Sequence, residues 1–405
     1  MILKNCRLIP ELCEGFEQEL ADIRIESKKI AEILPAGGDY AGEEVIDIAG
    51  KTVIPGMYNC HVHMGLFQNS FTNLNACTHD EYIFHSINYA QELLSYGFTT
   101  IRDCGGVDNV NIDVRNAINA GLIQGPNVLA CGNIITPDFA GSAYIPFYTA
   151  SERHSHPFRG SEDALPFVRE YVARGADFIK LTTTSNKAKI KQSVDQVGKF
   201  LFTPEEIKAI REACNKEEVP LACHSTCPES HDAVIEAGAD TMEHGLYMTQ
   251  ENVDKIIAKG NKTAYIPTLA VSYVGFKKGW PTYDDTHNGA GNAVRMCHDA
   301  GVLVGFGTDD FQKDFRKFPA VEFVARSEFG IPNIDIIKQA TINSAIAMGV
   351  GKKKGTIAVG KVADLAVFDG KPDEDLMAFN VKAAYVFKNG NMVVDHGIVT
   401  NAGVK

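Results

Sequence analysis

Four histidines and one aspartate stand where short apolar segments of the chain end, and their side chains are of types that bind divalent metals. They close the stretches "NCHVHM", "LACHS", "TMEHG" and "GFGTD", and they are His61, His63, His224, His244 and Asp309. Residues i and i+2 of a strand point to the same side, so His61 and His63 could share one ion. Taken singly, each residue could be a hydrogen-bonded core histidine or a helix cap. Their succession instead predicts a metal site with nitrogen and oxygen ligands, a set that suits zinc.

Lys180 interrupts "GADFIKLTTT", a stretch that otherwise has the apolar run of a strand buried on both faces. A buried lysine tends to lose its proton, and its pKa can fall from ~10.4 to ~5–6, which corresponds to roughly 6 kcal/mol. One explanation is a salt bridge to a buried carboxylate. The other is a neutral amine that takes part in chemistry. The strand alone leaves both explanations open.

The elements that must position these residues alternate between short apolar strands and helical stretches. The candidate strands are Met57–His63, Phe98–Asp103, Asn127–Cys131, Asp177–Thr182, Val219–His224, Thr241–His244, Thr263–Pro267 and Val302–Asp309. Thr203 and Glu206 form a capping-box signal at the start of one helix between them. Eight strand–helix units predict an α/β fold, a (β/α)8 barrel of the TIM type, whose active site lies at the C-terminal ends of the strands. Lys180 and the five other candidates would then surround one opening.

The two ends of the chain alternate apolar and polar residues between glycine and proline breaks, as in "ADIRIESKKIAEILPAGG" and "VKAAYVFKNGNMVV". This pattern is typical of short antiparallel strands. We expect residues 1–55 and 356–405 to form one small composite β-sandwich domain, beside a catalytic barrel at residues 56–355.

Composition narrows the classes of partner. The net charge is −12 and no basic block occurs, so neither nucleic acid nor an anionic membrane is an expected partner. There is no signal peptide or apolar run of ~18 residues, and the ten cysteines form no CxxC pair, which together favour the cytoplasm. The expected partner is a small-molecule substrate, and a homo-oligomer is compatible with the sequence.

The constellation resembles the amidohydrolase superfamily, in its binuclear-metal subgroup. "TVIPGMYNCHVHM", "GFTTIRDCGG", "GADFIKL", "AGADTMEHG", "GFGTD" and "KKKGTIAVGKVADLAVFDG" are similar to blocks of that family and cover nearly the whole chain. The resemblance is closest to the Xaa-Pro dipeptidase-like and imidazolonepropionase-like branch. It implies a carbamate on Lys180, formed with carbon dioxide, that bridges two divalent ions. By resemblance, His61, His63, Lys180 and Asp309 hold the first ion, and Lys180, His224 and His244 hold the second.

This resemblance also implies a mechanism. A water that bridges two cations has a pKa near ~7, so it attacks the scissile carbonyl as hydroxide. Asp309 takes the proton and passes it to the leaving amine, which makes it the expected general base. Asp310 should face away by strand alternation.

Deamination is the competing chemistry within this superfamily. Deaminases typically carry a glutamate two or three residues after the fifth-strand histidine and lack the strand-four lysine. Here His224 is followed by Ser225, Thr226 and Cys227, and Lys180 is present. Both features favour amide hydrolysis.

The substrate signal is weaker. Tyr247, in "HGLY", matches a substrate-binding tyrosine of dipeptidase-like relatives, although it could also be a packed loop residue. The loop at residues 132–160 lacks the early histidine that such relatives carry, and His154 and His156 come later in it. Asp103 could support the metal ligands or cap a turn.

The function that we expect is metal-dependent hydrolysis of an amide bond in a dipeptide or an N-acyl amino acid. One alternative is hydrolysis of a cyclic amide such as an imidazolone or hydantoin. The other is a non-catalytic metal-binding barrel.

Overall fold

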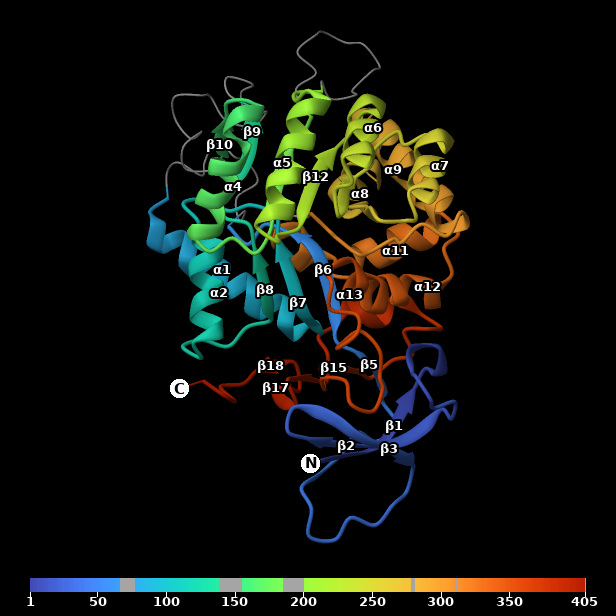
Figure 1. Ribbon diagram of the computed structural model, residues 1–405. Coiled ribbons are helices and arrows are strands. Elements are labelled where there is room, and N and C mark those ends of the chain that lie inside the picture. Colours follow the sequence, from blue (N-terminus) through green and yellow to red (C-terminus); the bar gives the residue numbers. More distant parts are fainter. Residues whose placement is uncertain (66–76, 138–154, 185–199, 278–280, 310–311, 405) are drawn as a thin grey trace.

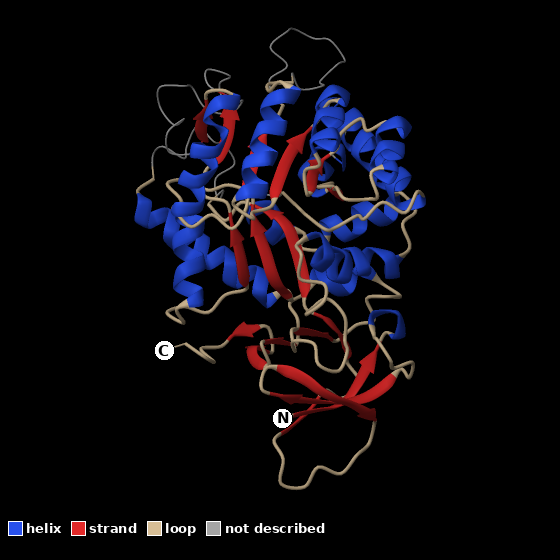
Figure 2. Ribbon diagram, in the orientation of Figure 1, coloured by secondary structure: helices blue, strands red, loops and turns tan. Residues whose placement is uncertain are grey.

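The structure is a computed structural model, and it describes residues 1–404 except 66–76, 138–154, 185–199, 278–280 and 310–311. Figures 1 and 2 show a larger part in which helices surround strands, and a smaller sheet near which both termini lie. None of the helices in these ranges combines the length and apolar character needed to cross a lipid bilayer.

Parallel strands line the inside of the larger part. β6 (Met57–Val62), β7 (Phe98–Asp103) and β8 (Asn127–Ala130) form one run, and β11 (Ile179–Thr182), β12 (Leu221–Ser225), β13 (Thr241–His244) and β14 (Ala264–Ile266) form another. The amide of Asp177 donates to the carbonyl of Ala130 at 2.8 Å and joins β8 to β11. Residues 302–308 join β14 to β6, because Gly305 N donates to Tyr265 O at 2.9 Å and Cys60 N donates to Phe306 O at 2.7 Å. The ring of eight segments is therefore closed, which confirms the predicted barrel.

The eighth segment differs from the strand that was predicted for residues 302–309. It is extended but has one isolated bridge, between Val304 and Tyr265, in place of a regular ladder. A Cβ atom at Gly307 would lie 2.8 Å from the Cβ atom of His61, so glycine allows this segment to approach β6 closely. Side chains replace part of the missing ladder, since Ser344 Oγ accepts from Phe306 N and Asn59 Oδ1 accepts from Thr308 N.

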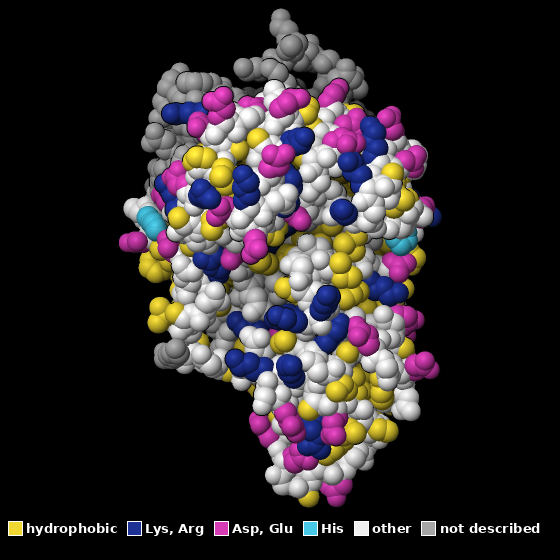
Figure 3. All heavy atoms as spheres, viewed as in Figure 1, with side chains coloured by type: hydrophobic (Ala, Val, Ile, Leu, Met, Phe, Trp, Pro, Cys, Tyr) yellow, Lys and Arg dark blue, Asp and Glu magenta, His cyan; other side chains and the backbone are white. Residues whose placement is uncertain are grey.

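Helices follow the strands around the barrel. They are α1 (His79–Ser95), α2 (Val110–Asn119), α4 (Ala164–Ala173), α5 (Pro204–Lys216), α6 (Pro228–Ala237), α7 (Gln250–Ala258), α8 (Ala270–Lys277), α9 (Pro281–Asp299), α10 (Gln312–Lys317), α11 (Val321–Glu328), α12 (Asn333–Lys338) and α13 (Ser344–Ala347). The predicted capping box at α5 is present, because the amide of Glu206 donates to Thr203 Oγ1 at 3.2 Å. Figure 3 shows acidic and basic side chains intermixed over the helices on this face.

The long connection after β8 contains two short strands, β9 (Ile134–Pro137) and β10 (Ser155–Phe158), which pair in parallel. β9 also pairs with β11. His154 lies outside the described residues, and so does the side chain of His156, so the expectation for these two histidines stays a prediction.

Both chain ends contribute to the smaller sheet, as predicted. Its strands are β1 (Ile2–Leu8), β2 (Leu20–Glu26), β3 (Lys29–Pro35), β4 (Val45–Asp47), β5 (Thr52–Pro55), β15 (Leu365–Phe368), β16 (Tyr385–Lys388), β17 (Asn391–Asp395) and β18 (Ile398–Val399). The N-terminal β5 pairs antiparallel with the C-terminal β15, with Thr52 opposite Phe368. Apolar side chains from both ends, including Leu3, Ile23 and Phe387, form a separate buried cluster here. The two ends therefore fold as one unit that carries the start of β6.

Candidate metal and catalytic site

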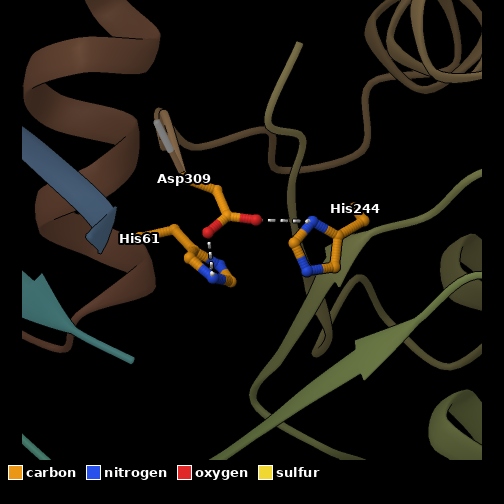
Figure 4. A group of neighbouring side chains, drawn as sticks. All are labelled: His61, His244 and Asp309. Carbon is orange, nitrogen blue, oxygen red and sulfur yellow. Dashed lines mark ion pairs between the residues drawn. The ribbon is translucent and has the colours of Figure 1, made fainter. Parts of the chain in front are cut away.

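Three of the metal-binding candidates meet at the C-terminal ends of the barrel segments. Figure 4 shows His61 from β6, His244 from β13 and Asp309 from the eighth segment with their side chains turned toward one another. The distance from His61 Nε2 to Asp309 Oδ1 is 3.6 Å, and that from His244 Nδ1 to Asp309 Oδ2 is 3.8 Å. His63 Nε2 lies 3.3 Å from the same Asp309 Oδ1. The structure thus brings three of the predicted histidines around the carboxylate of Asp309.

His224 lies beside this group, at the end of β12. Its ring centroid is 4.4 Å from that of His244. Its Nε2 atom is buried and has no hydrogen-bond partner among the described residues. An orphaned imidazole nitrogen is costly to bury, so this atom is suited to a ligand that the protein itself does not provide.

Lys180 is 2% exposed and lies on β11, the neighbour of β12. In the register of β11 and β12, Lys180 pairs with Ala222 and Thr182 pairs with His224, so the side chains of Lys180 and His224 project to the same side of the sheet. Within the described ranges, no carboxylate oxygen comes within 4.0 Å of its amine nitrogen. In that part of the chain, Lys180 therefore has no carboxylate with which it could form the salt bridge.

Hydrogen bonds fix the orientation of the first two histidines. His63 Nδ1 donates to the carbonyl oxygen of Gly105 at 2.8 Å, and His61 Nδ1 donates to Glu243 Oε2 at 2.8 Å. Both acceptors lack a proton, so each ring carries a proton on Nδ1 and turns its Nε2 atom toward Asp309. Burial lowers the pKa of His63, but the hydrogen bond and the charge of Asp309 raise it overall. Such outer partners are typical of histidines that bind metals.

Glu243 and Arg102 form a buried network behind His61 that the sequence reasoning missed. An Arg102 guanidinium nitrogen donates to Glu243 Oε1 at 2.6 Å, and neither residue is more than 5% exposed. Burial alone would raise the pKa of Glu243, but Arg102 and His61 lower it to about 2. A usable signal was present, since Arg102 interrupts the apolar strand "FTTIRD" in the same way that Lys180 interrupts its own.

The ionisation states suit a metal site. Burial and the neighbouring His61 lower the pKa of His244 to about 3, and burial also depresses the pKa of His224. Burial would raise the pKa of Asp309, but His61 and His63 hold it well below its usual range. Imidazole nitrogens around an ionised carboxylate are a donor set that fits zinc or a similar divalent ion.

A second group of possible ligands, His61, Cys104 and Glu243, does not suit a metal. Burial raises the pKa of the Cys104 thiol, which stays protonated, and Arg102 already occupies the Glu243 carboxylate.

Backbone strain coincides with the predicted residues. His244, Tyr247 and Asp309 have φ angles of 68°, 61° and 51°, in the left-handed region that side chains other than glycine rarely adopt. Such residues are found where the surrounding structure forces them, often at functional sites. Tyr247 is half-buried in the loop after β13, and its ring packs against Gly289 of α9.

Asp103 supports the turn after His63. It is buried at the end of β7 and accepts hydrogen bonds from Met64 N at 2.6 Å, Gly105 N at 3.0 Å and Asn111 Nδ2 at 2.8 Å. Because Gly105 in turn accepts from His63, Asp103 acts on that histidine through the backbone. Both alternatives considered for Asp103 are therefore partly correct.

Comparison with known proteins adds independent evidence. The model of the amidohydrolase family matches residues 52–401. Among curated proteins, the chain is 25% identical over 376 residues to an ochratoxinase of Aspergillus niger, covering 85% of this chain and 76% of the relative. It is 24% identical over 439 residues to a 5-methylthioadenosine/S-adenosylhomocysteine deaminase of Desulforudis audaxviator, covering 98% and 92% of the two chains.

A solved structure is similar over the whole chain. A Xaa-Pro dipeptidase with methionine bound in its active site superposes with a TM-score of 0.83 at 27% identity, covering 96% of this chain and 98% of that one. Fold and sequence therefore agree with the resemblance drawn from the strand-end motifs. The chain belongs to the amidohydrolase family, and it is an enzyme that hydrolyses a carbon–nitrogen bond.

Proposed function

We propose that this enzyme cleaves the amide bond of a dipeptide or an N-acyl amino acid with the help of two divalent ions, zinc being the best match. The observation that carries this proposal is Lys180. It is buried within β11 on the side from which His224 also projects, and it has no carboxylate partner in the described ranges. The burial of this lysine is explained if its neutral amine is converted into a group that binds the divalent ions.

Lys180 would become that ligand by carbamylation. The neutral Nζ attacks the carbon of carbon dioxide, a nitrogen–carbon bond forms, and one proton leaves to solvent. The product is an anionic group with two oxygens at the end of β11. Together with His61, His63, Asp309, His224 and His244, it would hold both ions. When bound, these ions lower the pKa of the attacking water and polarise the scissile carbonyl.

Asp309 is the residue that moves the proton. Its carboxylate is ionised and its backbone is fixed, because Asp309 N donates to His61 O at 2.9 Å. One carboxylate oxygen accepts the proton of the attacking water and then donates it to the leaving amine nitrogen. Tyr247, three residues after His244, would contact the substrate carboxylate from the neighbouring loop.

Two features argue against deamination, the chemistry that one relative's name indicates. Lys180 is present at the fourth barrel strand, and Thr226 and Cys227 stand two and three residues after His224, where a deaminase would place a glutamate. The Ser225 and Thr226 hydroxyls are also buried in hydrogen bonds, to His231 and Thr184 respectively, so neither is arranged as a ring-protonating acid.

The test combines metal content with turnover. Protein made with ample zinc and bicarbonate should bind close to two ions per chain, by elemental analysis, and should hydrolyse members of a panel of dipeptides and N-acyl amino acids. Turnover of cyclic amides alone would favour an imidazolone- or hydantoin-type substrate. Two ions with no turnover on any panel would mean that the cleaved carbon–nitrogen bond belongs to another class of compound, and a single ion that cannot be raised would contradict the binuclear site.

A further inference from the structure

The loop after β13 has an unusual backbone. His244, Gly245 and Tyr247 all have positive φ angles, of 68°, 58° and 61°. Two buried side chains donate to carbonyl groups of this loop. The Tyr265 hydroxyl donates to His244 O at 2.7 Å, and His231 Nε2 donates to Leu246 O at 2.8 Å. These bonds fix the peptide unit between His244 and Gly245 and the unit between Leu246 and Tyr247, so the second bond acts directly on the backbone of Tyr247.

His231 lies on α6, and it is fully buried. Burial lowers its pKa to about 4, so the ring is neutral and carries one proton. A carbonyl oxygen only accepts, so that proton is on Nε2 and points at Leu246. The other nitrogen, Nδ1, lies 2.7 Å from Ser225 Oγ, within hydrogen-bond distance. His231 therefore joins the end of β12 to the loop after β13.

The contact with Ser225 continues toward the metal side of the site. Ser225 Oγ lies 2.7 Å from Ser230 Oγ, which lies 2.6 Å from Thr183 Oγ1. Thr183 donates to the carbonyl oxygen of His224. All four side chains, His231 included, are fully buried, so this is a continuous polar path through the protein interior. Such a path has few alternative arrangements, because each unpaired member would be costly.

We propose that His231 is a positioning residue, which holds the loop at residues 244–249 so that Tyr247 meets the substrate. This inference rests on the proposed function for the role of Tyr247. His231 does not touch the reacting atoms. It acts through a single hydrogen bond to Leu246 O, while its other nitrogen maintains the link to the strand that carries His224.

A matched pair of variants separates the two contacts of the ring. In glutamine, the amide nitrogen is as many bonds from Cα as Nε2 is in histidine, so His231→Gln can still donate to Leu246 O. In asparagine, the amide nitrogen is at the distance of Nδ1, so His231→Asn can keep the Ser225 contact but leaves Leu246 O without its donor. Both variants replace the ring with an amide side chain. Each variant therefore serves as a control for the packing that is lost with the ring.

The first readout does not need a substrate. Amide hydrogen exchange of the segment 244–249 should speed up by roughly tenfold in His231→Asn and stay near wild type in His231→Gln, in line with the loss of one buried hydrogen bond. Equal exchange in the two variants, whether both fast or both slow, would overturn the proposal. That result would leave the proposed function untouched, since it depends on turnover by the wild type.

The second readout uses the panel substrate that the wild type hydrolyses fastest. KM should rise roughly tenfold in His231→Asn with a smaller change in kcat and an unchanged metal content, and His231→Gln should restore it. In a Tyr247→Leu background, His231→Asn should add little to KM, because the residue that it positions is gone. Full additivity of the two substitutions, or a Tyr247→Leu variant with wild-type KM, would refute the positioning role.

Discussion

Replacing Lys180 with alanine tests the central inference, because the carbamate and salt-bridge explanations predict different outcomes. If the lysine is a carbamate, Lys180→Ala loses a ligand that both ions share, and turnover and metal affinity fall together. The substitution also leaves space at the end of β11. A short carboxylic acid such as acetate or propionate should enter that space, supply two oxygens and restore activity in a saturable manner.

The expected effect on stability follows from the burial of the side chain. The substitution removes three methylene groups, worth about 2 kcal/mol at ~0.8 kcal/mol each. It also removes an ammonium group that is 2% exposed and has no carboxylate within 4.0 Å in the described ranges, and burying such a group costs several kcal/mol. The two terms oppose each other, so the free energy of unfolding of metal-free protein should change little. Breaking a buried ion pair would instead cost ~3–5 kcal/mol.

The assay measures turnover at rising acetate or propionate concentration, with urea unfolding of the metal-free protein in parallel. Lys180→Met is the matched control, since its side chain fills the same space and should not be rescued. Wild-type protein reloaded with zinc in buffer free of carbon dioxide should regain activity slowly, and bicarbonate should speed this recovery. If neither the acid nor bicarbonate has an effect, and the alanine variant is destabilised by ~3–5 kcal/mol, the salt-bridge explanation is the correct one.

Five further substitutions test the proposed ligands, the general base and the network behind His61. His61→Ala and His63→Ala should each abolish turnover and lower metal content. The circular dichroism spectrum should stay native, because both side chains lie at the barrel opening and not in the apolar core. Near-normal turnover in either variant would contradict the assignment of these histidines as metal ligands. Asp309→Asn should abolish turnover but keep substrate binding by calorimetry, whereas Asp310→Asn, which lies outside the described residues, should matter much less; the reverse order would refute the general base. The pKa of Glu243 is lowered from 4.5 to about 2, so its ionised form stabilises the metal-free fold above pH 4.5 by about 3 kcal/mol, and this contribution is lost as pH falls toward 2. Urea unfolding of Glu243→Gln across this range should show a flatter acid limb, and an unchanged slope would be evidence against the network.

The barrel and most of its site could be predicted because strand ends converge. Once eight parallel segments are recognised, residues as distant in sequence as His61 and Asp309 must meet at one opening, and the structure places them 3.6 Å apart. The hydrophobic pattern also predicted the terminal sheet. In the structure, β5 near the N-terminus pairs with β15 near the C-terminus, and both strands are apolar. These are consequences of periodicity, which a single sequence displays.

Other features depend on contacts that periodicity does not reveal. The eighth segment is held by Asn59 and Ser344 side chains in place of a strand ladder, and nothing in its own sequence specifies those partners. The same holds for His231, whose neighbours come from β12 and from the loop after β13. By contrast, Arg102 could have been identified by the reasoning applied to Lys180, because a charged residue in a buried strand always needs a partner or a use.

Arg102 and Lys180 show why burial alone does not determine the role of a charged residue. Both lie on barrel strands and are nearly inaccessible to solvent. Arg102 forms an ion pair with Glu243 at 2.6 Å, and this pair holds the Glu243 carboxylate next to His61. Lys180 has no such partner in the described ranges, and its neighbours are histidines whose pKa values it depresses further. A buried ammonium group without a carboxylate partner is unfavourable, and the proposed carbamate would replace it with an anion. Burial and the lack of a carboxylate partner in the described ranges are thus the two observations that support the proposed modification of Lys180.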